Sequence, residues 1–191
     1  MKKIFIGVPN TGFLKTELVE WLFRLKNDDK FKTTLFFPQN RPHDYNRNVI
    51  VTEFLKTDND YLLMIDSDVV PVSNVLELAN FDVGIVSGYV KAYKNGETIP
   101  IGMKKVKGGY KVKSPLKVGM NEVDAVGTGC LMVKREVFEK MDKPYFRFQY
   151  DENGFLSNGE DFHFCEKAKQ LGYKIYFNGS YPAQHFTLVN I

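Results

Sequence analysis

The first residues from which we expect chemistry form a short acidic motif. Asp66 and Asp68 are separated only by Ser67, and they follow the apolar run 61–65. Two carboxylates this close repel each other unless a cation lies beside them, and hard divalent cations prefer oxygen ligands. The motif therefore predicts a divalent-cation site, although an Asp-rich turn after a buried strand is the simpler structural alternative.

A second acidic motif opens a helix that we expect over residues 159–171. Glu160 and Asp161 lie in its first turn, where the helix dipole favours negative charge. Asp161 shares a helical face with Phe164 and Ala168, and the dipole does not explain an acid on the apolar face. Because perturbed acids in clefts are frequent at active sites, we interpret Asp161 as a candidate functional residue.

Two basic side chains extend these motifs. Arg47 begins the buried stripe of a helix predicted at residues 44–56, an unusual place for a solvated Arg. It either pairs with a neighbouring acid or, if the metal site is real, binds phosphate. His185 lies in a short strand near the end of the chain. A lone His is more often structural than a ligand, so His185 gains weight only if Asp68 needs a further protein ligand.

Two turns offer backbone amides and small side chains to a ligand. They contain Pro9, Asn10 and Thr11 after the first strand, and Gly127, Thr128 and Gly129 in a later strand region. Thr11 is also expected to cap the helix that follows it. The two glycines around Thr128 indicate close approach by either a ligand or a neighbouring segment of chain.

The elements that must position these residues follow an α/β pattern. The first part reads strand–helix–strand–helix–strand, which is typical of a mononucleotide-binding half-sheet, but it has no Gly-rich dinucleotide fingerprint and no P-loop Lys. A β-rich excursion is expected over residues 92–118, and a long polar and aromatic loop over 143–158. The predicted strands are 3–8, 32–37, 61–65, 83–90, 123–133, 173–177 and 183–186, and the predicted helices are 13–26, 44–56, 72–79, 135–141 and 159–171.

Length and composition bound the class of protein. The chain has 191 residues, 43% of them hydrophobic and 26% charged, which predicts one ordinary globular domain. Its formal net charge of +3 is too small to indicate nucleic acid or a membrane surface as partner. Cys130 and Cys165 lie in apolar surroundings and predict free buried thiols. Because no stretch is long enough to span a bilayer, we expect a soluble cytoplasmic protein, and the sequence indicates no oligomeric state.

Several phrases, taken in order along the chain, carry a family resemblance. They are Val8-Pro9-Asn10, Arg47-Asn48, Asp66-Ser67-Asp68, Gly127-Thr128-Gly129-Cys130-Leu131, Glu160-Asp161-Phe162-His163-Phe164-Cys165, Gly172-Tyr173-Lys174-Ile175 and His185. In this order they resemble a GT-A fold glycosyltransferase of the inverting family that includes chitin- and cellulose-synthase-like enzymes, most closely its small soluble bacterial and phage-borne members. The resemblance covers nearly the whole chain, and its specificity lies in the order and spacing of the motifs.

The resemblance implies a role for each motif residue. Asp68 and His185 would ligate Mn²⁺ or Mg²⁺, and Asp66 would lie near the nucleoside ribose or reach the metal through water. Asp161 would be the catalytic base of an inverting transfer, with Glu160 as its partner. The donor would be a nucleotide-diphosphate sugar, expected to be UDP-linked, with Arg47 adding positive charge beside its diphosphate. The residues expected to bind this donor are Pro9, Asn10, Thr11, Arg47, Asp66, Ser67, Asp68, Gly127, Thr128 and Gly129.

The implied fold is a Rossmann-like GT-A fold, a mixed, mainly parallel sheet flanked by helices with a small β-rich excursion. We expect a single domain over residues 1–191, with a nucleotide-binding half at 1–90 and an acceptor-binding half at 91–191. The acceptor would carry a hydroxyl group on a glycan, a lipid-linked molecule or another compound, and the loop 143–158 would shape its site. The sequence lacks the Gln/Arg-x-x-Arg-Trp motif of processive synthases, which favours addition of a single sugar, and its residues 10–12 depart from the family's hydroxyl–Tyr–Asn pattern, so the base is not fixed.

Three alternatives stay open at this point. A retaining GT-A glycosyltransferase would need no base near the acceptor. The run 65–69 is also similar to haloacid-dehalogenase-like phosphatases, in which Asp66 would be the nucleophile. Two features argue against a phosphatase. The acids follow two β-α units instead of the first strand, and Val70 stands where these phosphatases usually have a Thr, two places after the second acid. The third alternative is an inactive protein that only binds a sugar nucleotide.

Overall fold

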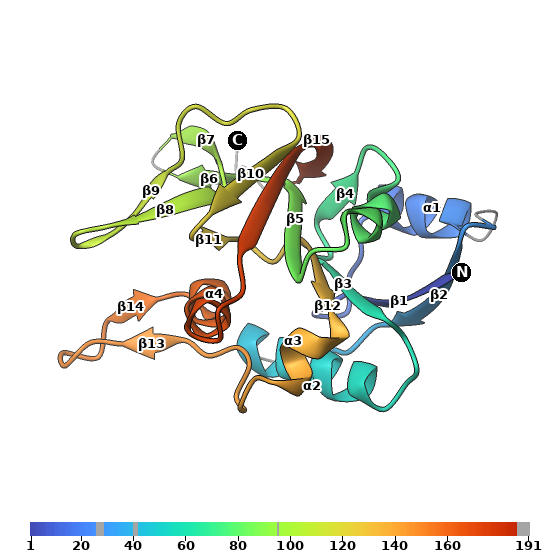
Figure 1. Cartoon of the computed structure of the whole chain (residues 1–191), viewed down its shortest axis with the longest axis horizontal. Helices are drawn as coiled ribbons and strands as arrows, with labels where there is room; N and C mark the ends of the chain where they lie inside the picture. Colours follow the sequence, from blue (N-terminus) through green and yellow to red (C-terminus); the bar gives the residue numbers. More distant parts are fainter. Residues whose placement is uncertain (26–28, 40–41, 95, 187–191) are drawn as a thin grey trace.

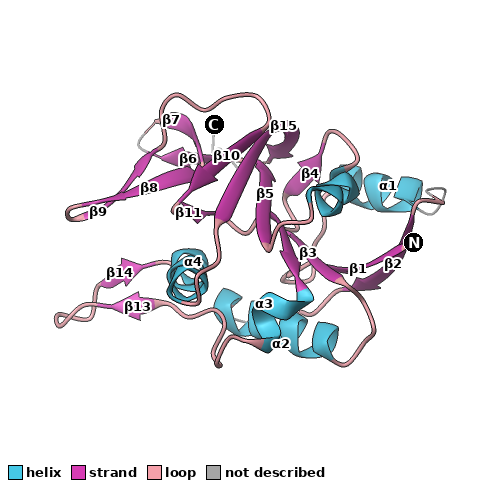
Figure 2. Cartoon of the chain, in the orientation of Figure 1, coloured by secondary structure: helices cyan, strands magenta, loops and turns pink. Residues whose placement is uncertain are grey.

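The computed structural model describes residues 1–25, 29–39, 42–94 and 96–186. Its helices are α1 (Thr16–Arg24), α2 (His43–Leu55), the 3₁₀ helix η2 (Val75–Phe81), α3 (Arg135–Glu139) and α4 (Glu160–Gln170). The helices α2, α3 and α4 cover one face of a central sheet, and α1 and η2 cover the other (Figures 1 and 2). The protein is therefore a three-layer α/β/α arrangement.

The central sheet is mixed. Its strands are β1 (Lys2–Gly7), β2 (Phe31–Phe36), β3 (Tyr61–Ile65), β4 (Val69–Pro71), β5 (Ile85–Tyr89), β10 (Met120–Val123), β12 (Cys130–Lys134) and β15 (Ile175–His185). They lie in the order β10-β15-β5-β12-β3-β1-β2, and β4 pairs with β15. The pairs β1–β2, β1–β3 and β5–β15 are parallel. Strand β12 runs antiparallel to both of its neighbours, and β10 and β4 run antiparallel to β15.

Strand β3 has neighbours on both edges and helices on both faces, and all of its residues are buried. Leu62 and Met64 pack into the cluster with α2, whereas Leu63 and Ile65 pack into the cluster with α1 and η2. Because successive side chains of a strand point to opposite faces, a strand covered on both faces reads as an unbroken apolar run. The strand predicted at 61–65 is confirmed.

The β-rich excursion predicted at 92–118 is also present. It contains β6 (Lys91–Lys94), β7 (Glu97–Pro100), β8 (Gly102–Val106) and β9 (Gly109–Val112), and β11 (Ala125–Val126) pairs with β8. A separate hairpin consists of β13 (Gln149–Tyr150) and β14 (Leu156–Asn158). The hairpins β8–β9 and β13–β14 project from the same side of the molecule, and α4 lies beside the base of the β13–β14 hairpin (Figure 1).

Several element boundaries differ from the sequence expectation. The segment 143–158, predicted as a loop, contains the hairpin β13–β14. The two strands predicted at 173–177 and 183–186 are one strand, β15, whose register shifts between Phe177 and Pro182. The strand β4 was not predicted, because three residues are too few to show a period.

The first helix also differs from its prediction. It begins at Thr16, and its N-cap residue is Lys15 with no side-chain cap, so the expected cap at Thr11 is wrong. The end expected near residue 26 lies outside the described residues.

The predicted fold class, an α/β mixed sheet flanked by helices with a small β-rich excursion, is confirmed. The expectation that the sheet is mainly parallel is wrong, because three of its strand pairs are parallel and four are antiparallel in the described residues. Both cysteines are free and buried, as predicted. None of the helices in the described ranges is long and apolar enough to cross a membrane.

Candidate active site

Backbone hydrogen bonds fix the turn that carries Asp66, Ser67 and Asp68. The Asp66 N–H donates to the Gly129 carbonyl over 3.2 Å, which ties the end of β3 to the segment before β12. On the far side of the turn, β4 pairs with the end of β15, and Val69 lies opposite His185. This short ladder brings His185 beside Asp68, although the two residues are far apart in the sequence.

Asp68 and His185 form a close pair. The ring Nε2 lies 3.3 Å from Asp68 Oδ2, and the ring Nδ1 lies 2.8 Å from the Lys91 carbonyl oxygen. The hydrogen bond to Asp68, with that to the Lys91 carbonyl, raises the pKa of His185 to about 9. Although burial opposes ionisation of Asp68, its hydrogen bond with His185 holds the pKa of this carboxyl below its usual range.

The geometry of this pair fits a divalent cation. A carbonyl can only accept, so Nδ1 carries a proton and donates it to Lys91. Because its pKa is about 9, His185 also carries a proton on Nε2 at neutral pH, and a cation bound between Nε2 and Asp68 would take the place of that proton. A ring N–H held by a backbone carbonyl is the usual arrangement of a metal-ligating His. At 3.3 Å the two groups are near enough for one cation to be held by both.

Asp66 has a different partner. Arg47 Nη1 and Nη2 donate to Asp66 Oδ1 and Oδ2 over 2.9 and 3.3 Å, and Arg47 Nε donates to Glu160 Oε1 over 3.1 Å. Only 5% of the Arg47 side chain is exposed. The guanidinium, expected beside a diphosphate, thus links the end of β3 to the start of α4. Among the residues that the structure describes, no three His, Cys, Asp or Glu side chains gather to hold a metal by themselves.

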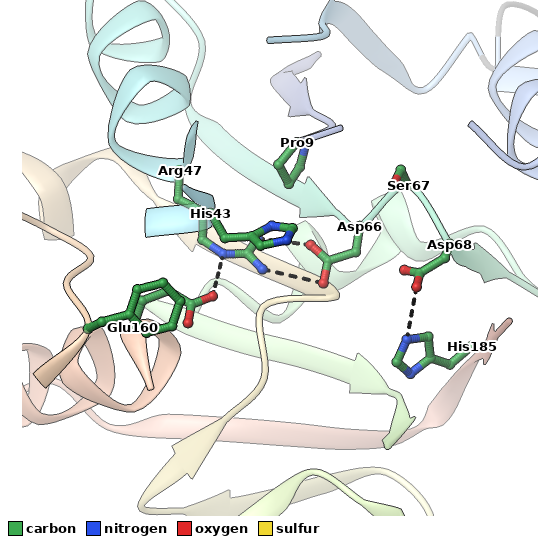
Figure 3. A pocket seen from close by; sticks show the side chains of 9 residues that line it. Pro9, His43, Arg47, Asp66, Ser67, Asp68, Glu160 and His185 are labelled. Atoms are coloured by element: carbon green, nitrogen blue, oxygen red, sulfur yellow. Dashed lines mark hydrogen bonds and ion pairs between the residues drawn. The ribbon is translucent and has the colours of Figure 1, made fainter. Parts of the chain in front are cut away.

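These side chains surround a cavity of about 290 Å³, here named the acidic cavity (Figure 3). Its lining includes the predicted site residues Pro9, Arg47, Asp66, Ser67, Asp68, Glu160 and His185. Three carboxylates, those of Asp66, Asp68 and Glu160, share the cavity with the Arg47 guanidinium. Without the charge of the histidines, the lining is therefore net negative and attracts cations. A diphosphate therefore needs added positive charge to bind in it.

Sequence reasoning missed two lining residues, His43 and Phe148. His43 lies four residues before Arg47 in α2, so helical spacing places it on the same face and was a usable signal. Phe148 lies in the segment predicted as a loop, and only its aromatic character marked it.

Other predicted donor-site residues lie outside the acidic cavity. Asn10 is 3% exposed, and its side chain bonds to the Val8 and Pro38 carbonyls, which stabilises the turn after β1. Thr11 lines a neighbouring cavity of about 420 Å³ that also contains Lys15 and shares Ser67 and Asp68 with the acidic cavity.

The Gly127–Thr128–Gly129 segment lies behind the site. A Cβ on Gly127 would approach Ile101 to 3.1 Å, and one on Gly129 would approach Val69 to 3.2 Å. Thr128 is 3% exposed. Side chains from other segments of this same polypeptide, and not a ligand, thus account for the close approach at both glycines.

Asp161 lines a second cavity, of about 460 Å³, between the two projecting hairpins. We name it the hairpin cavity. The first turn of α4 therefore presents Glu160 to one cavity and Asp161 to the other. Asp161 Oδ1 accepts the Phe162 N–H over 2.8 Å, and a Cβ on Gly159 would lie 2.7 Å from this oxygen, so Gly159 leaves room for the carboxylate. Burial, with the Glu160 charge, raises the pKa of Asp161 to about 7.

The comparisons with known proteins bear on the fold. No protein-family model and no curated protein matches this sequence. The structure of A197 from STIV matches with 25% sequence identity and a TM-score of 0.71, over 98% of this chain and 86% of that chain. UDP-glucose pyrophosphorylase complexed with UDP-glucose matches with 8% identity and a TM-score of 0.52, over 97% of this chain and 92% of that chain. The chain thus shares its fold with both proteins, the second of which is complexed with UDP-glucose.

Proposed function

We propose that this protein is a metal-dependent glycosyltransferase that moves a sugar from a nucleotide diphosphate, UDP in the first instance, to an acceptor hydroxyl with inversion. The observation that carries the proposal is the Asp68–His185 pair, whose ring nitrogen faces a carboxylate at the carboxyl end of a central strand. In open α/β sheets, ligands bind at this edge. A protein of the same fold is complexed with UDP-glucose, which supports the donor class by analogy.

In this proposal Asp68 and His185 hold Mn²⁺ or Mg²⁺. Such ions are commonly bound by one or two protein side chains, with substrate phosphates completing the shell. Bound there, the cation would neutralise charge on the leaving diphosphate. The donor would lie across the acidic cavity. Lys15 lines the neighbouring cavity, which Asp68 also lines, and would add a positive charge near the diphosphate.

Asp161 acts as the base. The acceptor oxygen forms a bond to the anomeric carbon while the bond from that carbon to the diphosphate oxygen breaks. The electron pair of the broken bond stays on the diphosphate, and the acceptor proton moves to the Asp161 carboxylate. Because the pKa of Asp161 is about 7, the ionised fraction of this base rises as the pH increases through neutrality.

Arg47 positions two acids in this scheme. Its bidentate contact orients Asp66 towards the donor, and its contact with Glu160 fixes the first turn of α4, on which Asp161 lies. The same contact argues against a phosphatase that uses Asp66 as nucleophile, because both oxygens of Asp66 already accept hydrogen bonds from a cation. Product configuration separates the inverting proposal from a retaining transferase.

Calorimetric titration of Mn²⁺ with and without UDP tests the proposal. With two protein ligands, Mn²⁺ alone should bind weakly, and UDP should strengthen its binding. By linkage Mn²⁺ must strengthen UDP binding by the same factor, which we expect to be about tenfold or more. Asp68→Ala should remove this coupling. Binding of UDP that ignores Mn²⁺ and chelator would argue against the metal role, and absence of binding by any nucleotide-diphosphate sugar would reject the function.

A further inference from the structure

The hairpin cavity is lined mainly by apolar side chains. Its walls come from β7, β8, β14 and the start of α4, and its volume of about 460 Å³ lies within the range typical of small-molecule sites. The apolar lining residues are Ala92, Ile99, Ile101, Met103, Leu156 and Phe162. Asp161, with its raised pKa, is the charged group among them.

Two of the polar side chains on the walls, Tyr110 and Asn158, are already paired with protein. The Tyr110 hydroxyl donates to Glu166 over 2.8 Å, and Glu166 also accepts a hydrogen bond from Lys105. Asn158 Nδ2 donates to Gln149 Oε1 over 3.0 Å. These contacts hold the walls in place and engage both side chains, so that the uncharged polar side chains left on the walls are the exposed Tyr93 and Ser157. A hydroxyl-rich molecule that entered the cavity would give up its hydrogen bonds to water and form few new ones. An apolar group has no hydrogen bonds to water to give up.

Aromatic contacts further indicate a preformed site. The Tyr110 and Phe162 rings are 4.7 Å apart between centroids, so the β8–β9 hairpin packs on α4. The apolar surface therefore lies directly beside the carboxylate to which the proposed function assigns the acceptor proton.

We propose that the acceptor is an amphipathic alcohol whose alkyl or aryl group fills the hairpin cavity while its hydroxyl group faces Asp161. This inference rests on the proposed function and narrows its acceptor class. The hydroxyl oxygen forms the new bond to the anomeric carbon, the bond to the diphosphate breaks with its electron pair on the leaving oxygen, and the hydroxyl proton moves to Asp161.

A pair of probes that differ only in the apolar group tests the inference. The probes are octyl β-D-glucopyranoside, used below its micelle concentration, and methyl β-D-glucopyranoside. Each fully buried methylene raises affinity about fourfold, so burial of even two predicts octyl binding about tenfold or more tighter than methyl binding.

Methyl NMR locates the binding. With labelled Ile and Met methyl groups, octyl glucoside should shift Ile99, Ile101 and Met103. A second apolar groove, between α1 and β2, is lined among the described residues only by Leu, Val and Phe side chains, so detergent bound there would not produce these shifts.

Two leucine variants provide a matched control. Leu156 and Leu171 are both largely exposed, at 57% and 45%, but only Leu156 lines the cavity. Leu156→Ser should weaken octyl glucoside binding about fourfold or more, and Leu171→Ser should leave it within about twofold.

Equal affinity for the two glucosides, equal effects of the two variants, or the absence of shifts at Ile99 and Met103 would overturn the inference. The Mn²⁺ and UDP titration is independent of this experiment. If UDP binds and octyl glucoside does not, the acceptor inference alone fails. If no nucleotide binds, the proposed function fails, and the acceptor role fails with it.

Discussion

Asp161 makes the same local hydrogen bond as another acid at a helix start, but its surroundings differ. Asp44 makes the same local contact in α2, where its Oδ1 accepts the N–H of the next residue over 2.8 Å. Only Asp161 lines the hairpin cavity, and its pKa is raised to about 7. Asp161→Asn keeps the shape and removes the base, so kcat should fall by roughly two to four orders of magnitude. Asp44→Asn is the control and should leave kcat unchanged; near-normal turnover in Asp161→Asn would contradict the role.

The same substitution should stabilise the fold. The folded pKa of about 7 exceeds the ordinary 3.8, so wild-type stability decreases as the pH rises from about 4 to above 7, where the folded state must hold a charged Asp161. The full shift corresponds to about 4 kcal/mol, and because Asp161 lines a cavity, solvent screening is expected to reduce this to about 2 kcal/mol. In urea unfolding, Asp161→Asn should be the more stable protein by about this amount at pH 8, and the gain should vanish near pH 4. A destabilised variant at pH 8 would show that Asp161 is structural.

His185 offers a second test at the level of one residue. If it completes the metal site, His185→Ala should weaken Mn²⁺ affinity about tenfold or more, because removal of a direct ligand exceeds the usual effect of an outer-shell partner. His163→Ala is the control, since His163 lies on α4 and does not line the acidic cavity. An unchanged Mn²⁺ titration in His185→Ala would assign His185 a structural role.

The sequence was sufficient to select candidate site residues, but not to predict which residues they contact. The short spacing of Asp66 and Asp68 was visible, and so was the position of Arg47 on a buried helical face. The contact of Arg47 with Glu160 spans 113 positions of the chain, and helical spacing specifies a face without specifying what lies opposite. The helix dipole favours an ionised Asp161, but the sequence does not show how deeply the carboxyl is buried or how near Glu160 lies. Both raise the pKa of Asp161.

At the level of elements, Arg47 joins three of them: it lies on α2 and binds the end of β3 and the first turn of α4. Arg47→Met would leave two carboxylates facing each other without a cation. Because breaking a buried ion pair in this way is strongly destabilising, we expect a loss of about 3 kcal/mol in the free energy of unfolding. Arg24→Met removes an exposed pair with Glu20 and should change stability by less than about 0.5 kcal/mol. Similar small losses in both variants would show that the Arg47 contacts do not hold the elements together.

The predictability of elements follows their length. Strand β3 was evident because five consecutive buried residues leave an apolar run. Strand β4 has three residues and no period to detect, yet its pairing with β15 places His185 beside Asp68. The register shift within β15 made one strand look like two. The elements hardest to infer from sequence are thus the ones that assemble the candidate metal site.

At the scale of the whole molecule, the two sequence halves contribute interleaved strands to one sheet. Strand β5, from residues 1–90, lies between β12 and β15, both from residues 91–191. Alternating β-α elements predicted the fold class, but a hydrophobic pattern does not encode strand direction, so the antiparallel β12 was not foreseen.

The interleaving predicts a single cooperative unit. Urea unfolding of the full chain should give one transition by fluorescence and by circular dichroism, because neither half has a complete sheet. A fragment of residues 1–90 lacks β12, which separates β3 from β5, and should give no cooperative transition. A folded, UDP-binding fragment would show instead that residues 1–90 form an autonomous unit.

Proton NMR of the anomeric signal during turnover tests whether this protein transfers a sugar with inversion. UDP-α-glucose, octyl β-D-glucopyranoside and Mg²⁺, which is diamagnetic and leaves the proton signals sharp, would be incubated with wild-type protein and with Asp161→Asn, and other nucleotide sugars would be screened in the same way. We predict that the first product formed carries a β-linked sugar, that chelator stops its formation, and that Asp161→Asn slows it by about two orders of magnitude or more. An α-linked first product, or no consumption of any nucleotide sugar in the presence of Mg²⁺ or Mn²⁺, would rule out a transfer with inversion.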